Sequence, residues 1–180
     1  WADTRTGVGT AADDTLADNY WCNIATNAGS AWTGFIRGFS LFDTSSLTAS
    51  ATISSAIQSL YVTSVIDQYN QGIRLTQATP ASNTAIAASD FEATLNETTA
   101  QADDIDITAL TTSAYNDQSL NATGLGNISK TGITKFGYKT TGDATNTEPT
   151  PASSNEGTVQ GNSGDAVSNK IKLTIVYTLP

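Results

Sequence analysis

The stretch Phe35-Ile-Arg-Gly-Phe-Ser-Leu-Phe-Asp43, continued by Thr44-Ser-Ser-Leu47 and Ile53-Ser-Ser-Ala-Ile-Gln-Ser-Leu-Tyr-Val62, decides the fold class. Side chains alternate between two faces along a β-strand, so Phe35, Arg37, Phe39 and Leu41 share one face. Asp43 and the hydroxyl residues after it hydrogen-bond to their own backbone and end a strand. We therefore expect two paired strands, at 33–43 and 53–65, joined by a polar corner.

The rest of the chain repeats this pattern of short strands and polar turns. Further strands are expected at 20–26, 73–79, 105–110, 118–121 and 133–141, near 158–160, and at 170–179. In the last of these, Ile171, Leu173, Ile175 and Tyr177 share one face, which indicates an antiparallel sheet with one solvated face. Leu125 and Ile128, spaced at three residues, predict one or two helical turns within 122–132. The predicted fold is all-β, an antiparallel β-sandwich or jelly roll with one short helical segment.

The length suits one domain with a sizeable core. Residues 1–19 are polar and are expected to form an N-terminal arm or edge strand, and residues 20–180 a single β-sandwich domain. Residues 81–104 are expected to form a long loop anchored by Phe91 and Leu95, and residues 142–169 a second long surface loop. Because the chain begins with Trp1 and contains no Met, we interpret it as a processed or trimmed product.

The charge balance and the missing residue types restrict the function. Eight basic and 17 acidic residues give a net charge of −9, which disfavours binding to nucleic acid or to anionic lipid. The chain has no His, which excludes a Ser–His or Cys–His nucleophile pair and a His-ligated zinc. No motif marks out the two carboxyl groups that a glycosidase needs, so we expect no enzyme activity. Cys22 is alone and cannot form an intramolecular disulfide; we expect a small buried side chain, the alternative being a reactive thiol.

Several blocks of sequence carry a family resemblance. They are, in chain order, Arg37…Leu41-Phe-Asp-Thr-Ser-Ser-Leu47, Ile53-Ser-Ser-Ala56 with Leu60-Tyr61, Thr79-Pro-Ala-Ser-Asn-Thr-Ala85 with Asp90-Phe91, Tyr115-Asn-Asp117 with Leu120-Asn121, Asn127-Ile-Ser-Lys-Thr-Gly-Ile-Thr-Lys-Phe-Gly137, and Leu173-Thr-Ile-Val-Tyr177. In order and spacing, from about Tyr20 to Tyr177, they resemble the DNRLRE-type modules, jelly-roll β-sandwiches related to carbohydrate-binding module family 96. Such modules occur in uncharacterised phage proteins and in secreted bacterial proteins. The resemblance implies an extracellular or virion-surface module and supplies no catalytic residues.

One residue departs from the family pattern. Gln58 stands where related strands place an aliphatic residue. Either Gln58 is buried and hydrogen-bonded, or the strand is shifted by one residue and Ile57 points inward.

Three groups of residues are candidates for a site. Asp103, Asp104 and Asp106 offer clustered carboxylates of the kind that Ca²⁺ prefers, although a solvated acidic loop has the same composition. The aromatic rings of Trp32 and Tyr69, taken as exposed, are the candidate platforms for a sugar. Arg37 and Asp43 lie near strand ends and are expected to pair as a structural brace of the corner.

These observations favour two classes of function. The first is a non-catalytic structural or assembly β-sandwich of a virion surface or extracellular filament. It would act through interfaces with itself or with other structural subunits, including strand exchange through the terminal strand or the arm. The alternative is a carbohydrate-binding or adhesion module of a secreted or tail-fibre protein, with glycans as partners. Neither reading requires a cofactor, nucleic acid or insertion into a membrane.

Overall fold

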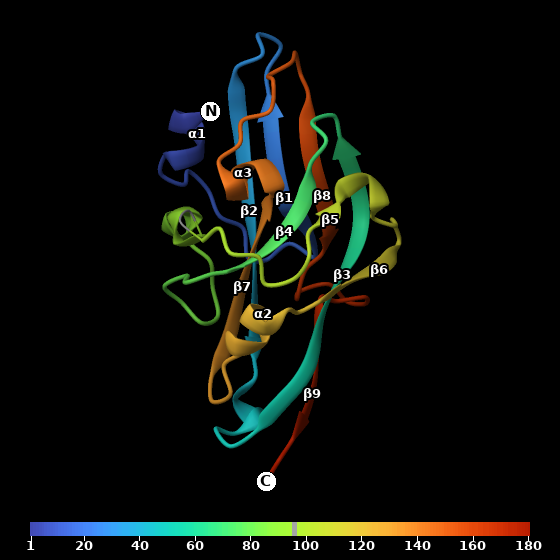
Figure 1. Ribbon diagram of the computed structural model, residues 1–180. Helices are drawn as coiled ribbons and strands as arrows, with labels where there is room; N and C mark the ends of the chain where they lie inside the picture. The colour runs from blue at the N-terminus through green and yellow to red at the C-terminus, as the bar shows by residue number, and fades with distance from the viewer. Residues whose placement is uncertain (95–96) are drawn as a thin grey trace.

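The protein is described by a computed structural model that covers residues 1–94 and 97–180, with the backbone alone for residues 93 and 94. The strands are β1 (Asp18–Thr26), β2 (Trp32–Asp43), β3 (Thr52–Asp67), β4 (Gly72–Gln77), β5 (Ile105–Asp106), β6 (Ala114–Ser119), β7 (Ile133–Thr140), β8 (Glu156–Asn162) and β9 (Lys172–Thr178). The α-helices are α1 (Ala2–Thr6), α2 (Ala122–Gly126) and α3 (Thr141–Thr145), and the 3-10 turns are η1 (Ser45–Leu47), η2 (Ala88–Thr94) and η3 (Ile107–Ala109). The molecule is elongated, with its C-terminus at one tip (Figure 1).

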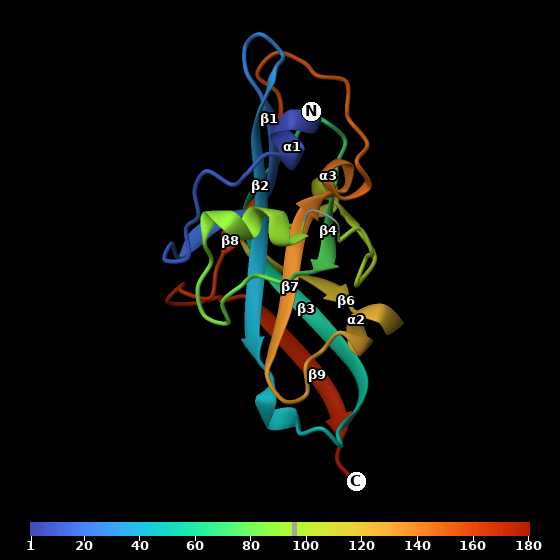
Figure 2. The ribbon, with the colours of Figure 1, turned by 90° about the vertical axis from the view of Figure 1, so that its left-hand side faces the viewer.

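The strands form one antiparallel network that is folded into two layers. The order is β5-β4-β7-β2-β1-β8-β3-β6, and β9 pairs with β3. Figure 2 shows β2 and β7 in front of β3 and β9. The predicted all-β sandwich is confirmed.

Strand β3 is long enough to pair with three other strands. Its edge toward β8 pairs with β8 through Val62–Asp67 and with β9 through Thr52–Ser59. The opposite edge pairs with β6. Strand β9 therefore takes over the position of β8 in the half of the sandwich that leads to the C-terminus.

One side of the sandwich is closed by a short bridge. Ala102 pairs with Leu120, just beyond the end of β6. The neighbouring Gln101 N–H donates to Leu75 O in β4 at 2.8 Å, and Gln101 O accepts from Asn121 N–H at 2.9 Å. The backbone around Gln101 thus joins the β4 end of the sheet to the β6 end.

Two expectations about the strands need correction, one about pairing and one about length. The strands at 33–43 and 53–65 exist as β2 and β3, but they do not pair with each other: β2 pairs with β1 and β7, and β3 with β6, β8 and β9. The corner between them carries the chain from one layer to the other, which is the usual connection in a sandwich. The expected strand at 105–110 is reduced to the two residues of β5 followed by η3.

The core explains the departure at position 58. Gln58 is fully buried, and its Nε2 donates to Lys172 O at 3.0 Å, while Ile57 is half-buried. The buried and hydrogen-bonded alternative is therefore correct. Cys22 is also fully buried, as expected, and burial raises the pKa of its thiol.

The N-terminal segment is more ordered than a simple arm. It begins with α1, and the described chain enters the sheet at Asp18, so no edge strand precedes β1. The helical turns α1 and α3 were not expected, whereas α2 lies where Leu125 and Ile128 predicted it. The expected anchor Phe91 lies in η2, and Leu95 falls outside the described residues.

A close approach between β1 and β2 yields a stability prediction. A Cβ at Gly38 would lie 2.5 Å from Trp21 O, so β1 and β2 must move apart to accept any side chain. We expect Gly38→Ala to lower the free energy of unfolding by about 1–3 kcal/mol. Chemical denaturation measures this. Gly126→Ala in α2 is the matched control, since a Cβ there meets nothing within 4 Å; equal losses in both variants would contradict the explanation.

Candidate functional site

Arg37, the predicted structural brace, forms a buried ion pair. Arg37 of β2 points away from the corner, and its Nε and Nη2 donate to the two carboxylate oxygens of Asp143 in α3, at 2.7 and 2.8 Å. Both side chains are almost completely buried. The expected pair with Asp43 is wrong: Asp43 accepts hydrogen bonds from the backbone and hydroxyl of Ser45 and so caps the corner by itself.

The same ion pair ties in two further segments. Arg37 Nη2 also donates to Arg5 O, and Arg5 Nε lies 3.0 Å from Asp143 Oδ1. Arg37 Nη1 donates to Phe91 O at 2.8 Å, with the guanidinium 4.0 Å from the Phe91 ring centre. Four segments distant in the chain therefore meet at one carboxylate and one guanidinium.

Sequence analysis missed Asp143 because it lies in a stretch with few apolar residues, which predicted a loop. A local signal was present. Thr140 Oγ1 accepts from Asp143 N–H at 3.4 Å, and a hydroxyl residue followed three positions later by an acid is the pattern that starts a helix.

Basic side chains also hold the loop between β4 and β5. Each donates to backbone carbonyls of this loop: Lys135 to Pro80 and Ser82, Arg37 to Phe91, Lys139 to Glu97, and Arg74 to Thr98. Carbonyl oxygens accept such charge-assisted bonds strongly. These bonds hold the loop across the outer face of the sheet, in addition to the backbone pairing at Gln101 and Ala102.

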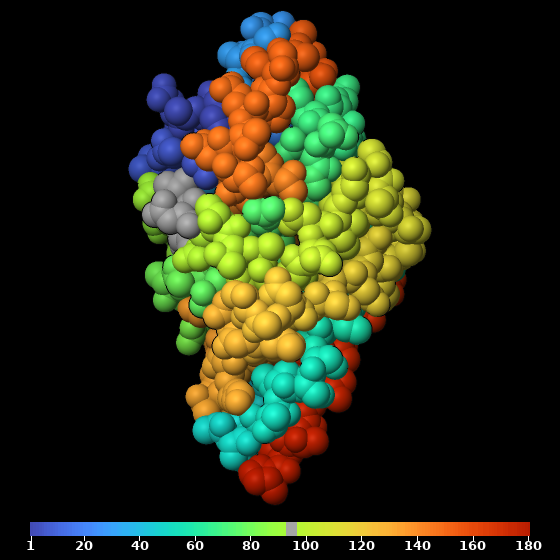
Figure 3. Space-filling view, in the orientation of Figure 1, coloured from blue at the N-terminus to red at the C-terminus, as the bar shows by residue number. Residues whose placement is uncertain are grey.

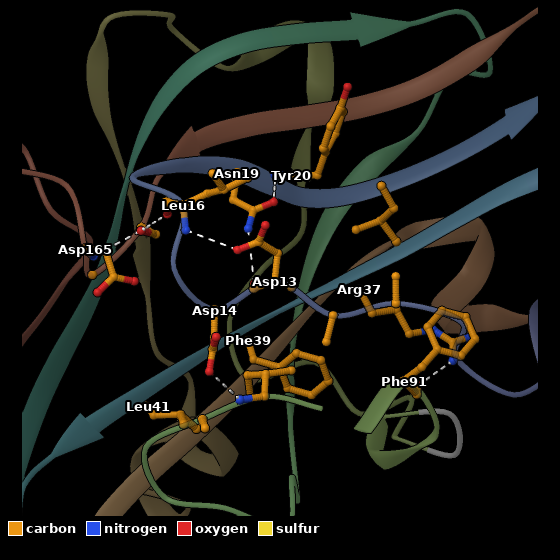
Figure 4. Close-up of a pocket in the computed structure, with 18 of the residues that line it drawn as sticks. Asp13, Asp14, Leu16, Asn19, Tyr20, Arg37, Phe39, Leu41, Phe91 and Asp165 are labelled. Carbon is orange, nitrogen blue, oxygen red and sulfur yellow. Dashed lines mark hydrogen bonds between the residues drawn. The ribbon is translucent and has the colours of Figure 1, made fainter. Parts of the chain in front are cut away.

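Beneath the N-terminal segment lies a groove along β2 (Figure 4). The groove has a volume of about 270 Å³; Phe39 and Leu41 of β2 line it, with Tyr20 of β1. Asp14 reaches across it, and its Oδ2 accepts from Ile86 N–H at 3.3 Å. The groove therefore combines apolar side chains with carboxylates at its rim.

The side of the sandwich opposite the closing bridge is open. Trp32–Arg37 of β2 pair with β1, but among the described residues none pairs with Gly38–Asp43 on that edge. Strand β9 likewise pairs with β3 alone within the described chain. A hollow of about 270 Å³ lies next to these edges, lined by residues of β2 that include Phe42 and by Lys170 and Ile171. We call the free edges of β2 and β9 the open side.

Beyond Lys172, the free edge of β9 carries no charge. Residues 173–179 include no Asp, Glu, Lys, Arg or Pro. Val176, Tyr177 and Leu179 are 55, 39 and 57 % exposed, so Tyr177 does not enter the core as its strand face predicted. Edge strands of monomeric proteins are usually protected by charges, proline or bulges. This edge has the properties of a surface that pairs with another strand.

The expected sugar platforms are not exposed. Trp32 and Tyr69 are both buried in a small second core with Ile24, against which Trp1 and Phe35 pack. Trp32 Nε1 donates to Glu148 Oε1 at 2.7 Å, and Tyr69 Oη bonds with Thr26 Oγ1 at 2.7 Å. These rings present no flat face for a sugar, because aromatic neighbours cover them.

The expected Ca²⁺ ligands do not converge. Asp104 forms an ion pair with Arg74 at 2.6 Å, and Asp106 caps η3 by accepting from Thr108 N–H. Asp103 is exposed, and its backbone carbonyl accepts a hydrogen bond from Gln118. In the described ranges no group of three or more acidic or thiol side chains is arranged to hold a metal ion.

Comparison of the chain with models of protein families, with curated proteins and with solved structures finds no match. Across residues 1–94 and 97–180, no helix has the length and hydropathy needed to cross a membrane.

The buried ion pair predicts a large and specific loss of stability. We expect Asp143→Asn to lower the free energy of unfolding by about 3–5 kcal/mol, since it leaves Arg37 and Arg5 buried without a countercharge. Asp104→Asn is the matched control: its partner Arg74 is partly exposed, so the loss should stay below about 1 kcal/mol. Urea denaturation compares the two, and similar losses would show that Asp143 is not the key anion.

Lys139 predicts a pH dependence. Burial lowers the pKa of its ammonium group to about 8 from 10.5, opposed by the nearby Asp143 carboxylate. Between these values the unfolded chain binds more protons than the folded chain, so this group makes stability rise with pH from about 8 to about 10.5. Lys139→Met should remove that rise. Denaturation of both proteins across this range tests it, and parallel curves would refute it.

Proposed function

We propose that the chain is a non-catalytic structural or assembly module of a virion surface or extracellular filament. It associates with neighbouring subunits through main-chain pairing at the open side of its sandwich. The observation that carries this proposal is the free edge of β9, where seven consecutive uncharged residues follow Lys172. An added strand satisfies the free N–H and C=O groups of such an edge and covers its apolar side chains.

The charge distribution supports the same proposal. Lys170 and Lys172 are exposed at the start of β9, while most of the surface of this −9 chain is acidic or neutral. Two copies of this chain therefore repel each other over most of their surface. An uncharged edge allows identical subunits to approach each other without charge repulsion.

The carbohydrate-binding alternative retains one supporting observation. The groove along β2 combines the half-exposed ring of Tyr20 with Asp14 and Asp165, a combination suited to sugar hydroxyl and C–H groups. It is the weaker candidate, because Asp14 already accepts a backbone hydrogen bond and the expected platforms Trp32 and Tyr69 are buried.

A charge on the β9 edge tests the assembly function. We expect the wild-type chain to associate in a concentration-dependent manner, and Val176→Lys to raise the midpoint concentration by about tenfold or more, a cost of about 1.4 kcal/mol. Sedimentation velocity measures both. Val167→Lys is the matched control, because Val167 is a fully exposed valine outside the strands. A wild-type chain that stays monomeric at every soluble concentration would refute the proposal.

A further inference from the structure

The first six residues form a separate docking element, which we call the hook (Trp1–Thr6). The Trp1 ring packs edge-on against Trp32 and Phe35, with ring centres 4.9 Å apart in each case. Trp1 Nε1 donates to Asn146 Oδ1 at 3.0 Å, and Arg5 Nε donates to Asp143 O at 2.9 Å. The hook therefore makes both apolar and polar contacts with one site on the body of the protein.

That site, which we call the receptor, is built without the hook. It consists of Trp32, Phe35 and Arg37 on β2 with Asp143 and Asn146 around α3. Its parts are held by bonds that do not involve the hook: Arg37 binds both carboxylate oxygens of Asp143, and Trp32 Nε1 binds Glu148. The space-filling view shows the hook (dark blue) on the surface beside the segment that follows β7 (orange) (Figure 3).

The segment between the hook and β1, which we call the linker (residues 7–17), is mostly exposed, although Gly9 lies close against the backbone of Ala88. Val8 and Leu16 are 77 and 51 % exposed. A hollow of about 270 Å³ lies between the linker and β2 (Figure 4). A second hollow, of about 360 Å³, is lined by residues 7–11 and by Thr33, Phe35 and Ile36 of β2. Two bonds from Ser163 fix the end of the linker next to β1, because its hydroxyl donates to Leu16 O and its N–H donates to Ala17 O. In the described chain, residues 7–15 are joined to the body beyond β1 by the hydrogen bond from Ile86 N–H to Asp14.

A docked element on an exposed linker is an arrangement in which the element can exchange between identical molecules. The hook of a second copy offers the same indole ring, indole N–H and guanidinium to the receptor, so each contact is reproduced. Arg5 also meets a receptor whose central charge is the carboxylate of Asp143. Eleven linker residues reach at most about 36–40 Å when extended, enough to span to an adjacent body.

We propose that the hook docks into the receptor of a second copy of this chain when subunits are assembled. This inference rests on the proposed assembly function. A flexible linker of this length gives the hook an effective concentration of the order of millimolar at its own receptor. Subunits held side by side present their receptors at a similar concentration, so exchange costs little and links neighbouring copies.

Two full-length variants with complementary defects test the exchange. The acceptor carries Trp1→Ala and Arg5→Ala, which free its receptor, and the donor carries Phe35→Ala and Asn146→Gly, which weaken its own receptor. Both also carry Val176→Lys to suppress pairing at β9. Circular dichroism confirms that each is folded; if the donor does not fold, a fluorescently labelled chain with a wild-type hook and receptor and the same Val176→Lys change replaces it.

We expect the mixture to form a heterodimer with a Kd at least tenfold lower than the self-association of either variant, measured by sedimentation. Adding Arg5→Ala to the donor should weaken it about tenfold or more, whereas Thr6→Ala, an exposed side chain bonded within the hook, should leave it unchanged. Absence of a heterodimer up to about 1 mM would overturn hook exchange. The proposed function is judged separately, because it depends on the effect of Val176→Lys alone in an otherwise wild-type chain.

Discussion

The burial of Arg37 against Asp143 is the constraint on which the arrangement of the outer segments depends. Removing both charges from water is costly, and the cost is offset only when every donor and acceptor is satisfied. Here the Arg37 guanidinium donates to both carboxylate oxygens of Asp143 and to the backbone carbonyls of Arg5 and Phe91. The N-terminal helix, the loop between β4 and β5, and the segment after β7 are therefore held in place by one guanidinium.

Because most basic side chains are buried or bonded to the loop between β4 and β5, the surface carries mainly negative charge. Of eight basic residues, Arg5, Arg37 and Lys139 are buried, and Arg74 and Lys135 donate to loop carbonyls. Few cations remain at the surface to balance the acidic residues, most of which, unlike Asp90 and Asp143, are not buried. The association that we propose between copies would therefore rely on uncharged surface, which β9 offers beyond the exposed Lys172.

The strand positions could be predicted because alternation is a local property, and β1, β4, β7, β8 and β9 lie near their expected ranges. Pairing is not local. Asp143 lies 106 residues from Arg37, and no pattern in the sequence distinguishes it from the nearer Asp43 as a partner. The exposure predicted for Trp32 failed for the same reason, since Trp1 and Tyr69 reach it from distant segments.

The two sides of the sandwich differ in a way that bears on assembly. On one side, the backbone at Gln101 and Ala102 joins β4 to the end of β6, so the sheet has little free edge there. On the other, β1 turns from β2 toward β8, and β9 begins without a neighbour beyond β3 among the described residues. On the closed side, backbone outside the named strands covers the edge of the sheet. The open side lacks such cover and has a row of uncharged residues on β9, and this is the surface at which we propose that a neighbouring subunit pairs.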